Sequence, residues 1–96
     1  MKNLLTITIA LMLCIHTPGG VLEVIATSVN PSYYSLVGKH RTTDQPLYGS
    51  GVFIGNRIIA TLYSYDGMYD FSIDQNNLIG SVRGKTNGVV FLRECQ

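Results

Sequence analysis

The fold is decided in residues 55–88, which read GNRIIATLYSYDGMYDFSIDQNNLIGSVRGKTNG. Dipeptides typical of tight turns interrupt this stretch about every eleven residues: Gly55-Asn56, Asp66-Gly67, Asn76-Asn77 and Asn87-Gly88. The segments between them are apolar, or alternate between apolar and polar residues as strands do. This spacing predicts an antiparallel meander in which each strand pairs with the next one along the chain.

Segment 68–74 shows the clearest alternation, because Tyr69, Phe71 and Ile73 fall on one face and polar residues fall on the other. We therefore expect one buried and one solvated face. The expected strands number about six, at 32–38, 47–54, 57–63, 68–74, 78–83 and 89–93. In the last two strands the expected inward sets are Leu78 and Val82, then Val89 and Phe91.

The links between these segments are too short for parallel crossovers, so the predicted fold is all-β and antiparallel. We expect the sheet to curl into a half-barrel or small barrel, or to pair face to face with a second copy. Gly49 and Gly51 indicate a bulge, a bend or a close backbone approach. Open edge strands would invite pairing between chains.

Residues 1–26 are predicted to be a signal peptide that begins as an apolar helix. A basic start is followed by an apolar run over 4–15 and by the helix-breaking Thr17-Pro18-Gly19-Gly20. The run is too short for a membrane span. Cleavage is expected after Ala26, with a cut after Gly20 as the alternative, so that residues 27–96 form a single small domain that is secreted or periplasmic.

Cleavage of this signal would separate the two cysteines of the chain. Cys14 leaves with the signal, so Cys95 stays as a single thiol that either has no role or forms an intermolecular disulfide. In an alternative, Leu11-Met12-Leu13-Cys14 resembles a bacterial lipoprotein box, in which Cys14 is lipidated and anchors the chain. Leu13 stands where that box has Ala or Gly.

Residues 49–61, GSGVFIGNRIIAT, resemble the hairpin before the catalytic histidine of trypsin-like serine proteases. Residues 62–65, Leu-Tyr-Ser-Tyr, then lack that histidine, and the chain has no Gly-Asp-Ser-Gly nucleophile loop. Acyl transfer needs a nucleophile, a base and an oxyanion hole together. The resemblance therefore implies at most an inactive remnant of such a hydrolase.

Most of the chain after residue 26 also resembles small secreted β-meanders of the calycin type, lipocalin-like or avidin-like. The resemblance rests on the run Tyr48 to Asn56, on Tyr69-Asp70-Phe71 and on Leu78-Ile79-Gly80. Barrels of this type have about eight strands and enclose a ligand. The resemblance implies binding rather than chemistry, and six strands would need a second chain to complete the cup.

Charge and metal-ligand patterns suggest neither nucleic acid nor a metal as partner. The formal net charge is +1, and acidic and basic residues nearly balance after residue 26. His40 has no second ligand at zinc spacing, and the Lys39-His40-Arg41 run is expected to be a solvated loop. Asp66, Asp70 and Asp74 lack the glycine and glutamate of a calcium loop. We expect no cofactor and no metal.

The tyrosines offer a recognition surface, because a phenol combines apolar area with a hydrogen-bonding tip. We place it at Tyr63, Tyr65 and Asp66, around one of the turns. The leading hypothesis is a non-catalytic exported β-domain that binds a protein or glycan, or assembles with itself. The alternative is a ligand carrier formed by paired half-barrels.

Overall fold

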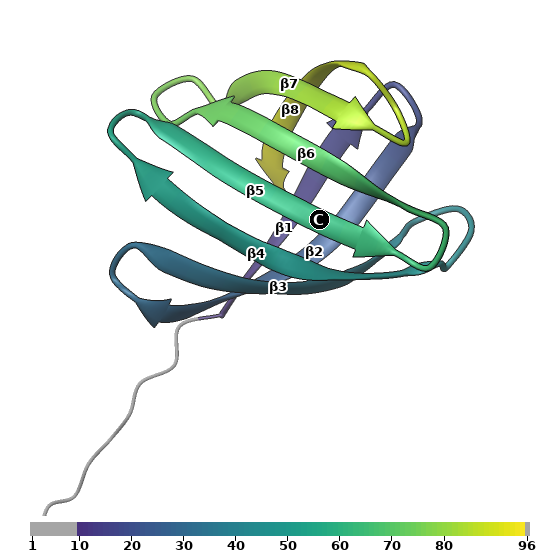
Figure 1. Ribbon diagram of the computed structural model, residues 1–96, viewed down its shortest axis with the longest axis horizontal. Helices are drawn as coiled ribbons and strands as arrows, with labels where there is room; N and C mark the ends of the chain where they lie inside the picture. Colours follow the sequence, from purple (N-terminus) through teal and green to yellow (C-terminus); the bar gives the residue numbers. More distant parts are fainter. Residues whose placement is uncertain (1–9, 96) are drawn as a thin grey trace, which may run out of the picture.

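The computed structural model describes residues 10–95 as a closed barrel of antiparallel strands that follow one another in chain order (Figure 1). The strands are β1 (Ala10–Thr17), β2 (Gly20–Asn30), β3 (Tyr33–His40), β4 (Pro46–Ile54), β5 (Arg57–Ser64), β6 (Gly67–Asp74), β7 (Ile79–Gly84) and β8 (Gly88–Glu94). Within residues 10–95 the chain forms no helix, and hence none of a length and hydrophobicity to cross a membrane. The predicted all-β antiparallel meander is confirmed.

The barrel has eight strands rather than six, because residues 10–30 form β1 and β2. No signal helix is present over 10–26, and residues 1–9 of the predicted signal lie outside the described residues. The apolar run serves as a strand because Leu13 and Ile15 face the barrel interior, while β1 pairs with both β2 and β8. The closure also removes the open edges that we expected to drive pairing between chains.

The buried face of β6 is as predicted, with Tyr69, Phe71 and Ile73 buried. In β8 the predicted face is wrong: Val90 is buried, whereas Val89 and Phe91 are exposed. The apolar residues of this strand are consecutive, so the sequence does not show which of them face inward. The pairing of Gly88 with the buried Val82 determines the inward face and places Val90 on it.

The inward set of β7 is half right. Val82 is buried, but Leu78 lies in the preceding turn with φ 60° and is exposed.

The turn predictions hold to within a few residues. Gly55-Asn56 joins β4 to β5, and Gly55 has φ 60°, a conformation that favours glycine. The next turn is Tyr65-Asp66, because Gly67 already begins β6. Gly49 makes the close approach that we expected, since a Cβ there would overlap the carbonyl oxygen of Thr61 on β5.

A disulfide between Cys14 and Cys95 fastens the seam where β1 meets β8. This seam is short: residues 13–16 pair with residues 91–94, whereas the pairing of β1 with β2 runs over residues 10–17. Cys95 is therefore paired within the chain, which corrects the prediction of a lone thiol or an intermolecular bond. A cross-link that spans 81 residues of sequence stabilises the fold by about 2–4 kcal/mol.

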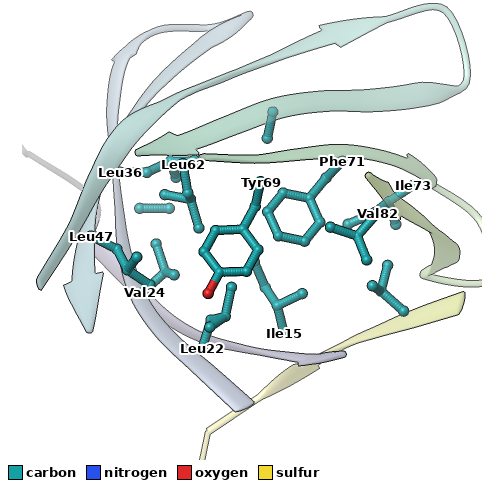
Figure 2. Close-up of a cluster of buried hydrophobic side chains, with 13 residues drawn as sticks. Ile15, Leu22, Val24, Leu36, Leu47, Leu62, Tyr69, Phe71, Ile73 and Val82 are labelled. Atoms are coloured by element: carbon teal, nitrogen blue, oxygen red, sulfur yellow. The ribbon is translucent and has the colours of Figure 1, made fainter. Parts of the chain in front are cut away.

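The core lies inside the barrel (Figure 2). The rings of Tyr69 and Phe71 lie side by side near its centre, with centroids 6.1 Å apart and planes 11° apart. Leucine and valine side chains surround these rings; Leu22, Leu47, Leu62, Val24, Val82 and Val90 are among the most deeply buried. One end of the barrel is packed by this core, and the other is not.

Candidate ligand site

The unfilled end of the barrel holds an apolar cavity of about 110 Å³. We call this end the mouth; it is the end at which β1, β3 and β5 begin, marked by Leu11, Tyr34 and Ile58. Leu13 and Ile15 of β1, together with Leu92 of β8, line the wall beside the closing seam. Phe71 of β6 lines the cavity from the core side, and Ile73, which pairs with Ile58, lines it nearer the mouth.

The cavity exists because several inward side chains between the core and the rim of the mouth are small. Along β2 the inward residues run from Leu22 near one end to Ala26 near the mouth. Along β5 the corresponding step is from Leu62 to Ala60, and Ala60 pairs with Gly51 of β4. A Cβ on Gly51 would lie 3.3 Å from the Cβ of Ala60, so the absence of that side chain leaves room inside.

The mouth is lined almost entirely by apolar atoms. Tyr34 is the one lining residue with a polar group on its side chain. Its ring meets that of Phe53 edge to face, with centroids 5.3 Å apart and planes 88° apart. Leu11, Val29 and Ile54 lie near this end and are exposed. Such a site can hold an apolar group and offers one hydroxyl to a polar group at the entrance.

The opposite end, which we call the closed end, is sealed by polar side chains from its turns. Asp66 of the β5–β6 turn accepts hydrogen bonds from Lys85 Nζ (2.6 Å), Ser64 Oγ (2.9 Å) and Gln45 Nε2 (3.1 Å). Lys85 also donates to Gln45 Oε1 and lies 5.9 Å from the ring centroid of Tyr69. The hydrogen bond from Lys85 is the largest cause of a lowered pKa for the Asp66 carboxyl, and the same bond raises the pKa of Lys85.

His40 seals the rest of the closed end, which corrects the expectation of a solvated loop. It ends β3, and its side chain is buried inside the barrel. The backbone N–H groups of Thr42 (3.2 Å) and Thr43 (3.4 Å) point at Nδ1, so Nδ1 accepts and Nε2–H donates to the carbonyl of Gly19 at 3.0 Å. His40 thus ties the β1–β2 turn to the β3–β4 loop.

The three predicted recognition residues lie at or beside the β5–β6 turn. Tyr63 points outward from β5, and Tyr65 stands at the tip of the next turn with 83% of its surface exposed. The Asp66 carboxylate is occupied by the closed-end hydrogen bonds. All three stay predictions as contact residues, and Asp66 has a structural role in addition.

In residues 10–95 no group of three or more His, Cys, Asp or Glu side chains is placed to hold a metal ion. The lining of the cavity also lacks any residue that could act as a nucleophile or base other than the phenol of Tyr34. What this arrangement can do is hold an apolar group by desolvation and shape.

Sequence reasoning missed the cavity residues. Leu13 and Ile15 were assigned to the signal, and the small residues Ala26, Gly51 and Ala60 gain meaning only when their register places them at one level of a closed barrel. Comparison of the chain with models of protein families, with curated proteins and with solved structures gave no match.

Proposed function

We propose that the protein is a non-catalytic carrier that binds a small apolar molecule, or the apolar chain of a larger one, in the mouth of the barrel. The observation that carries this proposal is the apolar cavity of about 110 Å³ at one end of a barrel whose other end is sealed. Water gains few hydrogen bonds in such a cavity, so an apolar ligand replaces it at little cost.

The cavity limits the size and chemistry of the ligand. An apolar cavity of about 150 Å³ binds benzene, so one of about 110 Å³ holds roughly four carbon atoms. No charged side chain lines it, so a carboxylate or amine of the ligand would stay outside, near the hydroxyl of Tyr34. We therefore propose a short alkyl chain or a single small ring as the buried part.

The resemblance of the chain to calycin-type meanders supports the same function, since such barrels enclose ligands. The carrier proposed here differs from a carrier formed by two paired half-barrels, because a single chain supplies all eight strands. Partners of other kinds, a protein or a glycan at Tyr63 and Tyr65, stay secondary proposals.

Calorimetric titration with a series of linear alcohols from methanol to decanol tests the carrier. Each methylene that enters the cavity should add about 0.8 kcal/mol, a fall in Kd of about fourfold per carbon. The gain should stop once the chain fills the space above Phe71, after roughly four carbons. A Kd that keeps falling through the whole series would contradict a cavity of this size, and no binding at all would contradict the proposal.

A matched pair of variants locates the binding. Ala60→Leu places a leucine in the cavity and should abolish alcohol binding while the barrel stays folded. Ser81→Leu adds the same side chain on the exposed face of β7, a strand that contributes no residue to the cavity, and should bind as the wild type does. Equal effects of the two variants would place the binding elsewhere.

Export remains part of the proposal. The Cys14–Cys95 disulfide is compatible with an oxidising compartment, where such bonds persist. Cleavage after Ala26 would remove β1, more than half of β2 and Cys14, so the barrel and a chain cleaved there are different species. Intact mass spectrometry of exported material, with and without reductant, distinguishes them; cleavage after Gly20 or lipid on Cys14 would also exclude the disulfide-closed barrel.

A further inference from the structure

A row of apolar side chains crosses the outside of the barrel. Cross-strand pairing places one residue from each of six consecutive strands directly opposite the next: Met12 (β1), Ile25 (β2), Val37 (β3), Tyr48 (β4), Tyr63 (β5) and Met68 (β6). All point away from the interior and are exposed over 38–59% of their surface. The rings of Tyr48 and Tyr63 are neighbours, with centroids 6.2 Å apart. We call these residues the apolar row.

Polar residues border the apolar row on both sides. Two positions toward the mouth, register pairs form a parallel row of small hydroxyl side chains: Thr27, Ser35, Ser50 and Thr61, which ends at Asp70. Toward the closed end, Glu23 pairs with Lys39. An apolar centre within a polar rim is the usual anatomy of a protein interface. The six residues are neighbours in the sheet, so they form a contiguous patch rather than single exposed residues.

We propose that the apolar row is the contact surface for a second copy of this chain. Its side chains together expose on the order of 600 Å², the upper end of what the largest apolar patch of a monomer exposes. A standard interface takes about 800 Å² from each partner. The curvature of the closed barrel lets one partner cover only the middle of the apolar row and the hydroxyl residues beside it, so the contact is smaller than that and we expect a weak dimer.

Charge favours a like partner over a charged one. The apolar row contains no charged residue, and the formal net charge of the chain is only +1, so two copies can bring these faces together with little repulsion. Homodimer interfaces are also the more apolar class, and tyrosine is enriched among their energetic centres. Tyr48 and Tyr63 are the expected anchors.

The curvature of the barrel sets where the contact is centred. The apolar row passes over β1 to β6 of an eight-stranded closed barrel, so one partner cannot touch both of its ends. The contact should centre on Val37, Tyr48 and Tyr63, in the middle of the apolar row. This surface lies on the outer wall, so dimerisation leaves the mouth free, and the inference does not depend on the proposed ligand.

The test is sedimentation equilibrium of the full chain from about 1 µM to about 1 mM, the range of weak to moderate dimers. Val37→Lys should raise the dimer Kd by about tenfold or more, because it places a charge in the centre of the contact. Val89→Lys is the matched control: Val37 and Val89 are outward valines, 58% and 56% exposed, but Val89 lies on β8 outside the apolar row. It should dimerise as the wild type does.

Tyr48→Ser provides a second test without added charge and should weaken the dimer less than Val37→Lys does. Circular dichroism of each variant reports whether it is folded. A wild-type chain that stays monomeric at the highest concentration would overturn the proposal, as would equal weakening by Val37→Lys and Val89→Lys. A monomer that instead binds phosphatidylcholine vesicles through the apolar row would also overturn it, in favour of a lipid surface.

Discussion

The two ends of the barrel are built from the same strands and differ in what their turns carry. At the closed end the turns are cross-linked by side chains: Asp66 and Lys85 join three of them through Gln45, and His40 reaches Gly19 of the fourth. At the mouth the side-chain hydrogen bonds of the turns are local, such as those that Asp74 accepts within its own turn, and backbone hydrogen bonds such as that from Gln75 to Asn56 join one turn to the next.

The two ends also differ in the size of their inward side chains. The closed end is filled by residues such as Leu22, Leu62 and Tyr69, whereas Ala26 and Ala60 leave the mouth hollow. Stability is therefore expected to reside mainly at the closed end, and binding at the mouth. A cavity costs stability, because the atoms that line it lose packing partners. Measurements that separate the two ends can establish whether the molecule divides its roles in this way.

The largest difference between the ends should come from deleting one leucine at each. Leu22→Ala, in the filled half, should lower the free energy of unfolding by about 3 kcal/mol, because it opens a new cavity among close-packed neighbours. Leu92→Ala, beside the existing cavity, should lower it by only about 1 kcal/mol, since its side chain is only partly buried. Urea denaturation of both variants measures this, and equal losses would show that the two halves are equally packed.

A smaller contrast should come from two glycines on β4. Gly49→Ala should lower the free energy of unfolding by about 2 kcal/mol or more, because its Cβ meets the backbone of Thr61 on β5. Gly51→Ala, two residues closer to the mouth, should change it by no more than about 0.5 kcal/mol and can raise it, since the methyl enters the cavity and alanine restricts the unfolded chain.

Thermal denaturation of the two glycine variants gives the comparison. Both glycines have an ordinary backbone φ, so conformational strain contributes to neither result. If Gly51→Ala were as costly as Gly49→Ala, the space at the mouth would not exist in solution.

How far the sequence predicts this molecule depends on whether local rules are sufficient. Tyr69, Phe71 and Ile73 alternate with polar residues, so their inward face could be assigned from period alone. In 10–17 and 89–92 both faces are apolar, because the outer wall carries residues such as Met12 and Val89. The period of the sequence then cannot assign the inward face of such a strand.

The cavity could not be predicted from the sequence for a further reason. The cavity depends on which small residues share a level of the barrel, and that depends on pairings such as Gly51 with Ala60 and on the closure of β1 against β8. The Cys14–Cys95 disulfide links the two ends of the sheet across nearly the whole chain. The even number of cysteines was the one feature of the sequence that indicated this disulfide.

The smallest expected effect tests the closed end alone, through acid. The hydrogen bond from Lys85 lowers the pKa of Asp66 in the folded protein, so the carboxylate is favoured by folding. Its contribution to stability is complete above the ordinary pKa of about 3.9 and is lost as the pH falls through the lower, folded value. Urea midpoints measured from about pH 6 to about pH 2 should fall for the wild type, and Asp66→Asn should flatten part of that fall.

Lys85→Met is the matched variant, because Lys85 is the largest cause of the shift. It should flatten the same part of the acid profile, and combining it with Asp66→Asn should add little. The effect is modest because both side chains are partly exposed to solvent. Parallel acid profiles for the wild type and Asp66→Asn would mean that this network does not hold the turns together. The closed end would then owe its closure to His40 and to the packing of Tyr69 alone.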